Sequence, residues 1–389
     1  AVENPREIDK FLVEAYLARR VLDHLIGFKV SPLLWRHVPR AKSAGRVQSP
    51  SLRMICERED EIDAFCPEEF WPIKAEFKTK DCIFSSDLVR NNGDDLKKTP
   101  VISEVDAKNL KQKIEKGNFS ILEINEKEVS YSPKAPFRTS TLQQAASSEL
   151  RMAPRRTMDI AQELFRGIES GDKVINLITY MRTDSTFISS EIMDSIGNFV
   201  VKAYGNDYYS SPRVYSKVSK NSQEAHEAIR PTDINNSPEK IKNQLSDQQY
   251  KLYKLIWDRT VGSQMKDSIS EKTVLSVLAE ENNNTYILES EYIRPVFDGF
   301  KILDEKTNYD NVPNITLNES LSIDKVHKQK NFTRPKSRYT EASLIKELET
   351  SGIGRPSTYA SIMDRIQYHK AVIILRRSLY RTNVGKAKI

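Results

Sequence analysis

The sequence predicts an α+β protein of several domains. Helical periodicity occupies both ends and the middle of the chain, and alternating β patterns separate these parts. The length of 389 residues exceeds what one hydrophobic core usually serves. The order helical, β, helical, β, helical suggests nested domains, since the termini of a domain usually lie close together. We therefore expect a helical domain of 1–64 with 334–389, a β domain of 65–138 with 269–333, and an inserted helical domain of 139–268.

The helical segments follow from spacing and capping residues. In the first, over 6–64, Pro32 and Pro39 are expected to interrupt the helix before it resumes over 47–62. Apolar residues recur at helical spacing in its first part: Ile8, Phe11, Leu12, Ala15, Ala18, Leu22 and Leu25. Further expected features are a capping box of Ser140 with Gln143, a helix capped by Ser189, a helix over 247–263, and helical structure from Thr340 to about residue 370.

The β segments alternate apolar and polar residues. "FWPIKAEFKTK" places Trp71, Ile73, Ala75 and Phe77 on one face of a strand. "NNGDD" at 91–95 predicts a turn, and "FSILEINEKEVSYS" at 119–132 a further strand. "KTVLSVLA", a polar "EENNN" turn and "TYILES" predict a hairpin that begins near Lys272.

Composition narrows the class of protein. The net charge of +6 and pI near 8.9 are compatible with nucleic acid without indicating it. Three cysteines without C-x-x-C spacing argue against a disulfide framework or zinc ribbon and favour the cytoplasm. No apolar run of about 18 residues is present, so no transmembrane helix is expected. The start "AVENPREIDKF" lacks a signal-peptide pattern and suggests a piece of something longer.

The stretch "LITYMRTDST", 177–186, carries the first candidate chemistry. Leu177 and Ile178 are expected to form a strand that enters a core, and Arg182 to Thr186 a solvent-facing loop. A tyrosine ester of phosphate keeps roughly the free energy of the phosphodiester it replaces, so Tyr180 could break and reseal a strand without ATP. Arg182, on the same side of a continuing strand, could stabilise the transition state. Taken alone, the stretch better fits a core tyrosine before a surface Arg–Asp pair.

The stretch "NSQEAHEAIRP", 221–231, predicts a short helix capped by Ser222 and stopped by Pro231. His226 and Arg230 would share one face and bind a phosphate, with His226 donating a hydrogen bond or a proton. A zinc-protease motif is excluded, because Arg230 stands where the second histidine is required. An ordinary surface helix is an equal alternative.

Two more stretches suit phosphate. In "SGIGRPSTYASI", Gly352 is expected to end one helix and Pro356 to open the next at its first position. Arg355, Ser357 and Thr358 would then lie at a helix N-terminus that favours anions, although a plain hinge is possible. The segment 40–53 is basic, and it includes Arg40, Lys42, Ser43, Gly45, Arg46, Gln48 and Arg53, with Arg19 and Arg20 on the preceding helix. A solvated basic face is its alternative. The four patches together favour phosphate binding.

The chain resembles the bacterial type IA DNA topoisomerases of the topoisomerase I branch. The matching stretches follow the family order and span almost the whole chain: "SPLLWRHVPRAKSAGRVQSPSLR", "APFRTSTLQQAAS", "LITYMRTDST", "NSQEAHEAIRPTD" and "YTEASLIKELETSGIGRPSTYASI". Only "YHKAVIILRRSLYRTNVGKAKI" at the end fits loosely. The resemblance implies a toroidal clamp in which a β arch, the β domain above, joins the two helical domains.

The resemblance also implies roles for individual residues. Tyr180 matches the nucleophile that forms a 5′-phosphotyrosine link, Arg182 the arginine that positions the scissile phosphate, and His226 a histidine near the nucleophile. Residues that match contacts to single-stranded DNA are Arg19, Arg20, Arg46, Gln48, Gln162, Arg355, Ser357 and Thr358. Arg166 departs from the family, which commonly has a glutamate there, so no role is transferred to it.

Other family features are missing from this sequence. The amino-terminal metal-binding (TOPRIM) domain carries an acidic D-x-D cluster, and the family's carboxyl-terminal zinc ribbons carry cysteines; neither pattern occurs here. The resemblance therefore implies that Mg2+ acts through a domain outside this chain. The chain itself is expected to bind no metal. We expect a cytoplasmic monomer whose partners are a single-stranded DNA segment and negatively supercoiled duplex. The full-length enzyme would relax such DNA by strand cleavage, passage and religation, whereas this chain alone would only bind a single strand.

Two other classes remain to be distinguished. The chain could be a single-stranded DNA-binding module or an inactive paralogue, which would bind DNA without forming an adduct. Tyrosine recombinases and type IB enzymes also combine Tyr, Arg and His, but they form 3′ links. Their tyrosine usually follows the basic residues, whereas Tyr180 precedes His226 and Arg355.

Overall fold

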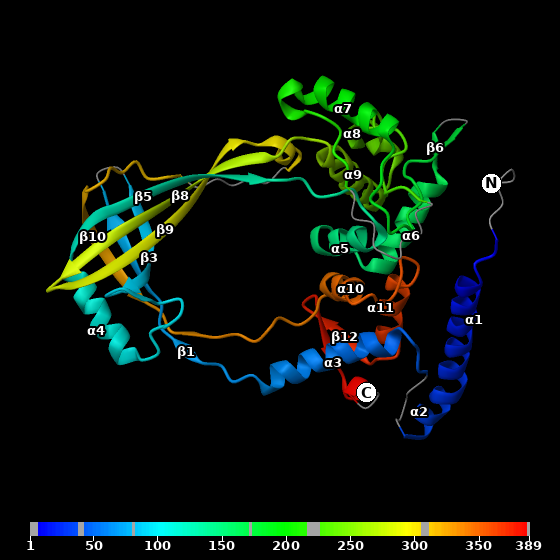
Figure 1. The fold of residues 1–389 in the computed structure, drawn as a ribbon, viewed down its shortest axis with the longest axis horizontal. Coiled ribbons are helices and arrows are strands. Elements are labelled where there is room, and N and C mark those ends of the chain that lie inside the picture. The colour runs from blue at the N-terminus through cyan, green and yellow to red at the C-terminus, as the bar shows by residue number, and fades with distance from the viewer. Residues whose placement is uncertain are drawn as a thin grey trace.

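The computed structural model describes residues 7–37, 43–79, 82–170, 173–215, 226–304 and 311–386. Figure 1 shows the elements following one another around a ring, with a β-sheet domain at one side and two helical units at the other. This toroidal arrangement of helices and strands confirms the predicted fold class. No helix in the described ranges has the length and hydropathy needed to span a membrane.

A seven-stranded antiparallel sheet forms the β arch. Its order is β2-β10-β5-β8-β9-β3-β4, and an additional pairing of β2 with β3 closes it on itself. In β2 the side chains of Ile73, Ala75 and Phe77 are buried and alternate with more exposed ones, as the sequence predicts. Asn282 and Asn283 adopt positive φ in the turn between β8 (Ser268–Glu281) and β9 (Asn284–Phe297), which confirms the predicted hairpin. The strands are β2 (Ile73–Lys78), β3 (Ile83–Asn91), β4 (Asp94–Asp95), β5 (Asn118–Tyr131), β8 (Ser268–Glu281), β9 (Asn284–Phe297) and β10 (Ser320–Lys328).

One helix of the β arch is missing from the sequence-based prediction. Helix α4 (Glu104–Glu115) is capped by Ser103, whose hydroxyl accepts from the Asp106 amide. Leu110 and Ile114 join the buried core of the sheet. The spacing of Ala107, Leu110 and Ile114 is helical, but the strands on either side obscured it.

The upper helical unit in Figure 1 has its own core, built from residues between Phe137 and Met265. Helix α9 (Asp247–Ser263) has the predicted bounds, and Ser189 is the N-cap residue of α7 (Ser190–Tyr204). The predicted capping box of Ser140 with Gln143 is wrong, because α5 begins earlier and both residues lie inside it. The other elements are α5 (Thr139–Glu149), α6 (Pro154–Arg166), β6 (Ile168–Ser170), β7 (Lys173–Ile175), the 3-10 helices η2 (Asn206–Tyr208) and η3 (Lys242–Gln244), and α8 (Pro238–Ile241).

The lower helical unit combines both ends of the chain. Its core joins α3, α10 and α11 with a terminal hairpin that the sequence did not predict. A two-stranded ribbon of β1 and β11 connects it to the β arch (Figure 1). Its elements are α1 (Lys10–Leu25), α2 (Ser31–His37), α3 (Gln48–Ala64), β1 (Glu69–Phe70), β11 (Asn331–Phe332), α10 (Glu341–Thr350), α11 (Tyr359–Tyr368), β12 (Val372–Leu375), β13 (Ser378–Arg381) and α12 (Asn383–Lys386).

The amino-terminal helix differs from expectation in two ways. Pro32 does not interrupt it, because a π-helical turn (Ile26–Val30) leads directly into α2, where Pro32 occupies the second position; Pro39 lies outside the described residues. The apolar face of α1 is exposed in the part of the chain that the structure describes, and Phe11, for example, is 84% exposed. An apolar face of this size usually marks an interaction surface.

The two helical units meet where the ring closes. Helix α5 lies against α10 and α6 against α11, and the cores of the two units are separate. Two of the buried cores contain only residues of one predicted domain each, but the core of the upper helical unit includes Phe137, which the prediction assigns to the β domain. The boundaries of the domains stay a prediction.

Asp258 on α9 gives a prediction for the pH dependence of stability. Burial raises the pKa of its carboxyl to about 6, although Lys254 Nζ lies 2.9 Å away. Since an unfolded aspartate titrates near pH 3.9, the folded protein binds more protons between about pH 4 and 6, and its stability falls as pH rises through this window. The Asp258→Asn variant should lose this contribution of up to about 2 kcal/mol. Thermal unfolding at pH 4.5 and pH 7 should therefore differ less for the variant than for the wild type; an unchanged difference would contradict the assignment.

Candidate active site

Tyr180 is held by two chain segments that run side by side. Ile178 pairs with Pro231, the Thr179 amide donates to the Arg230 carbonyl, and Thr179 Oγ1 donates to the Ala228 carbonyl. This pairing places the rings of Tyr180 and His226 5.0 Å apart, although the two residues are far apart in sequence. The predicted proximity of the tyrosine and the histidine therefore holds in the structure.

The tyrosine is anchored yet reachable. Its ring packs edge-on against Phe165 of α6 with 5.5 Å between centroids, and it is only partly buried. Leu177 and Ile178 are buried as predicted, but they form a single β-bridge rather than a strand. The chain bends after Ile178, so the prediction of Arg182 on a continuing strand is wrong. Arg182 is exposed, and no described residue makes a hydrogen bond or ion pair with it.

The polar residues after Arg182 are partly internal. Thr183 and Ser185 are buried, which corrects the prediction of a wholly solvent-facing loop. Thr139 is the reason: its hydroxyl donates to the carbonyls of Met181 and Thr183 and accepts from the Thr183 amide. The first turn of α5 therefore fixes the backbone on the carboxyl side of Tyr180.

The predicted helix around His226 is also wrong over the residues that the structure describes. From His226 to Arg230 the chain is extended or bent, and Ser222 lies outside the described residues. Arg230 is not a partner of His226 in a phosphate site, because its guanidinium is buried and donates to Glu227 Oε2 and the Pro231 carbonyl. The carboxylate of Glu227 also accepts from the Ser189 amide at the start of α7. Arg230 therefore has a structural role. Of the two residues, His226 is the one that is exposed to solvent.

The segment 354–358 forms a turn before α11, not its first turn. Pro356 is two residues ahead of the N-cap residue Thr358, so its predicted position is wrong. The Thr358 hydroxyl accepts from the Arg355 amide, and Arg355 and Ser357 are exposed. Gly352 follows α10 with φ of +69°, as the prediction of a helix end requires.

Tyr359, the first residue of α11, directly follows this turn and interacts with charged groups from several elements. Burial raises the pKa of Tyr359 to about 12; the Glu349 carboxylate adds to the effect, Arg355 and Arg138 oppose it, and Asp184 contributes last. These charges from α5, α10, the turn and the Tyr180 segment therefore surround one phenol. Residue-by-residue matching did not select Arg138, Asp184 or Glu349, and the only signal for Arg138 was its place in "APFRTST".

Helix α6 contributes a second face of the site. Gln162 is half-buried one turn before Phe165, which packs on Tyr180, so the two side chains share a face of the helix. Arg166 is exposed at the last position of α6. Its guanidinium makes no interaction with the side chains that the structure describes.

The remaining predicted contacts lie in the lower unit, away from the pairing that holds Tyr180. Arg19 and Arg20 are exposed on α1. Arg46 is paired with Asp23, at 2.8 Å from Nε to Oδ1, and its hydrogen bond lowers the pKa of that carboxyl. Gln48 Nε2 donates to the Ser43 carbonyl and hydroxyl. The functions of these four residues stay predictions. Arg46 and Gln48 already have partners within the protein, Asp23 and Ser43.

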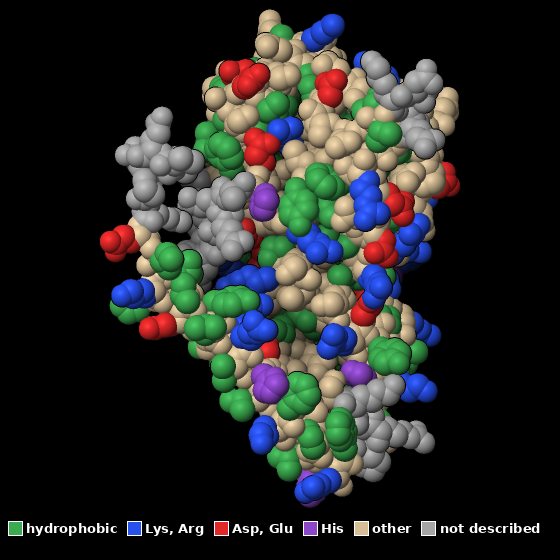
Figure 2. All heavy atoms as spheres, turned by 90° about the vertical axis from the view of Figure 1, so that its right-hand side faces the viewer, with side chains coloured by type: hydrophobic (Ala, Val, Ile, Leu, Met, Phe, Trp, Pro, Cys, Tyr) green, Lys and Arg blue, Asp and Glu red, His purple; other side chains and the backbone are tan. Residues whose placement is uncertain are grey.

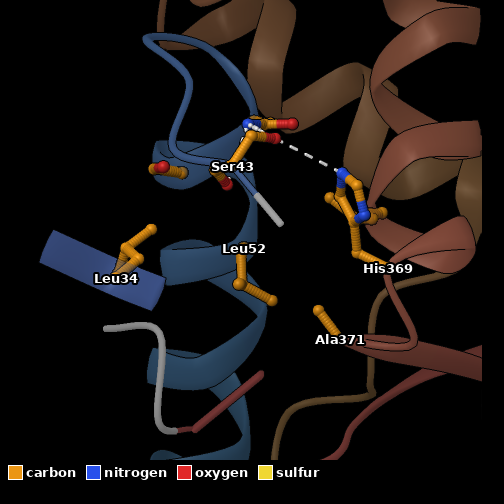
Figure 3. A pocket seen from close by; sticks show the side chains of 8 residues that line it. Leu34, Ser43, Leu52, His369 and Ala371 are labelled. Atoms are coloured by element: carbon orange, nitrogen blue, oxygen red, sulfur yellow. Dashed lines mark hydrogen bonds between the residues drawn. The ribbon is translucent and has the colours of Figure 1, made fainter. Parts of the chain in front are cut away.

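Figure 3 shows the small pocket beside Gln48. Ser43 Oγ lies 3.4 Å from His369 Nε2, and Leu34, Leu52 and Ala371 form the apolar wall. The cavity volume of about 30 Å³ accommodates at most a few water molecules and is far below that of pockets that bind organic ligands.

Cationic side chains lie near the site, and a metal-binding cluster is not found among the described residues. Figure 2 shows Lys and Arg side chains gathered across the middle of one face, where the helical units meet. Among the described residues, no group of three or more His, Cys, Asp and Glu side chains could hold a metal ion. The residues around Tyr180 therefore do not fit a Mg2+ site, which needs several oxygen ligands.

Comparison with known proteins agrees with this geometry. A family model described as DNA topoisomerase matches residues 7–388. DNA topoisomerase 1 of Rickettsia felis is 43% identical over 99% of this chain and 51% of its own length. The proteins of the same name from Xylella fastidiosa (Temecula1) and Helicobacter pylori are 40% and 38% identical over 100% and 97% of the chain.

A solved structure supports the same relationship. Full-length topoisomerase I from Thermotoga maritima aligns with a TM-score of 0.82 and 35% identity, over 99% of this chain and 61% of that one. The fold and the matched sequence define a DNA topoisomerase. More specifically, the chain belongs to the bacterial type IA DNA topoisomerase family. It spans about half the length of the Rickettsia, Xylella and Helicobacter relatives.

Proposed function

We propose that the full-length protein is a type IA topoisomerase that cleaves one DNA strand through Tyr180. The observation that carries the proposal is the contact of a rigidly held, partly exposed Tyr180 with His226, two residues before the exposed Arg182. Family membership supplies the reaction class, and these side chains supply groups suited to it. Strand passage through the open break and religation would then relax negative supercoils.

The proposed cleavage step is a displacement at phosphorus. The Tyr180 oxygen forms a bond to the phosphorus, the bond to the 3′-oxygen breaks, and the phenolic proton is balanced by protonation of the departing 3′-oxygen. The product is a 5′-phosphotyrosine and a free 3′-hydroxyl. Arg182 stabilises the charge on the phosphate oxygens, and His226 donates a hydrogen bond or a proton. Attack by the 3′-hydroxyl reverses the step without ATP.

The remaining basic and polar residues would bind the strand. Gln162 and the turn with Arg355, Ser357 and Thr358 lie near the active site, so they are proposed to contact nucleotides next to the scissile phosphate. Arg19, Arg20, Arg46 and Gln48 are proposed to contact the strand further along the lower unit. The ion pair of Arg46 with Asp23 would have to exchange for this contact.

Parts of the full-length protein outside this chain are proposed to hold the metal ion and to cover the apolar face of α1. The described residues do not fit Mg2+, so in the full-length protein other residues would hold it, and no step above is assigned to it. The exposed apolar face of α1 supports a further part of the protein packing there.

The chain by itself should bind single-stranded oligonucleotides and fail to relax a supercoiled plasmid. Phosphate contacts release counterions, so affinity should fall steeply between about 50 and 200 mM salt. Fluorescence anisotropy with a labelled oligonucleotide, together with a gel assay of plasmid topology with Mg2+ present, tests both parts. Robust relaxation by the chain, or affinity without salt dependence, would contradict the proposal.

A further inference from the structure

One carboxylate oxygen lies at the junction of the two helical units. Glu349 Oε1, near the end of α10, accepts a hydrogen bond of 2.5 Å from Ser140 Oγ of α5. The same oxygen lies 3.0 Å from Arg138 Nε. The Ser140 hydroxyl thus donates to this anionic oxygen, whereas the Arg138 guanidinium pairs with it by charge, and Arg138 Nε has no hydrogen-bond partner among the described residues.

This pair of donors belongs to the active site. Thr139 stands between Arg138 and Ser140 in sequence, and it binds the backbone of Met181 and Thr183 directly after Tyr180 and Arg182. Arg138 is also one of the charges around Tyr359, together with Arg355. An arginine and a hydroxyl are common ligands of a phosphate oxygen in protein–DNA complexes. The Glu349 oxygen therefore occupies a position suited to a phosphate of the strand.

The junction between the two helical units, to which Glu349 contributes, contains several polar contacts. The apolar cores of the two units are separate, and the contacts across the junction include Arg155 with Asp364 at 2.5 Å and Arg377 with the carbonyls of Ser147 and Ser148. Gln143, one turn after Ser140, is fully buried, and neither end of its amide has a partner among the described residues. A buried amide without a partner is unfavourable by about 1–3 kcal/mol. Charged and polar side chains of the described residues therefore contribute contacts across the closed junction, where α5 packs against α10 and α6 against α11.

We propose that Arg138 and Ser140 form a phosphate-binding pair for the DNA strand and that Glu349 occupies this pair when DNA is absent. The inference rests on the proposed function, because it requires a strand beside Tyr180. A phosphodiester oxygen and the Glu349 carboxylate carry like charge, so they compete for the same two donors. Binding of the phosphate then displaces Glu349 and removes one contact between α5 and α10. Strand binding and loosening of the junction are thereby coupled.

The Glu349→Gln variant tests the competition. Glutamine keeps the size of the side chain but removes its charge, so the single-strand affinity of the chain should rise about 3–10-fold at low salt. Arg138→Gln should lower the affinity, and the Arg138→Gln/Glu349→Gln double variant should lose the gain. The double-mutant cycle therefore measures competition at this donor pair rather than a general change of charge.

Asp364→Asn is the matched control. It removes another ion pair of the same junction, on α11, and should leave the affinity within about twofold of wild type. Unchanged or weaker binding by Glu349→Gln would overturn the inference, as would an equal gain in Asp364→Asn or a gain that survives without Arg138. A wild-type chain that fails to bind the oligonucleotide would instead refute the proposed function, and this inference with it. Thermal unfolding verifies that each variant is folded.

Discussion

The Tyr180→Phe variant of the full-length protein should form no covalent adduct with DNA. The substitution removes only the phenolic oxygen, and the ring contacts with Phe165 and His226 are retained. The neighbouring hydroxyls of Thr179 and Thr183 are engaged with backbone groups: Thr179 Oγ1 donates to the Ala228 carbonyl, and Thr183 Oγ1 accepts from the Ser185 amide. We therefore expect a loss of adduct to the detection limit, which is at least about 10³-fold in rate if an oxygen nucleophile is essential.

The Tyr180→Phe variant should still bind single-stranded DNA although it forms no covalent adduct. Because phosphate contacts are made by cationic and hydroxyl side chains, the affinity for a single-stranded oligonucleotide should stay within about twofold of wild type. The adduct is measured by trapping with detergent an oligonucleotide labelled at either end. Retention of only the 3′-labelled fragment identifies a 5′ link. An adduct through the other end would indicate the type IB class, and an unchanged yield in Tyr180→Phe would refute the tyrosine assignment.

The local patterns that were predicted correctly share a physical cause. Strand β2 and helix α9 each bury one face against a core within their own domain. The spacing of apolar residues in the sequence therefore predicts which of their side chains are buried. The paired asparagines at 282–283 similarly specify the hairpin, because their short side chains tolerate positive φ. Such features depend on residues close together in the chain.

The errors concern residues whose environment comes from distant segments. Arg230 looks like a surface cation in sequence, but the pairing of 228–231 with 176–179 turns it inward against Glu227. Thr183 looks like a loop residue, and Thr139, far away in the chain, buries it. Arg138 was not singled out because its significance arises from Glu349, which lies on another helical unit. Sequence spacing does not encode these encounters.

The Glu227→Ala variant should destabilise the upper helical unit. The Arg230 side chain is 9% exposed, and Glu227 Oε2 accepts from both its Nε and its Nη2. Loss of Glu227 leaves the buried Arg230 charge with the Pro231 carbonyl as its one remaining acceptor among the described residues, and it removes the acceptor of the Ser189 amide. Breaking a pair of this kind is unfavourable by roughly 3–5 kcal/mol. The melting temperature of this unit should therefore fall by about 10 °C relative to the wild type.

The exposed pair of Arg53 and Glu57 on α3 provides the control, since Glu57→Ala should change the free energy of unfolding by less than about 0.5 kcal/mol. A Glu227→Leu/Arg230→Met double variant should recover much of the lost stability, because no charge is then buried without a partner. It should not recover adduct formation fully if the Glu227–Arg230 pair also orients the backbone that carries His226. Calorimetry of the three variants separates these effects. A Glu227→Ala protein that melts with wild type would mean that Arg230 finds another partner, and that backbone pairing with Phe137, Phe187 and Thr179 suffices to hold the segment after His226.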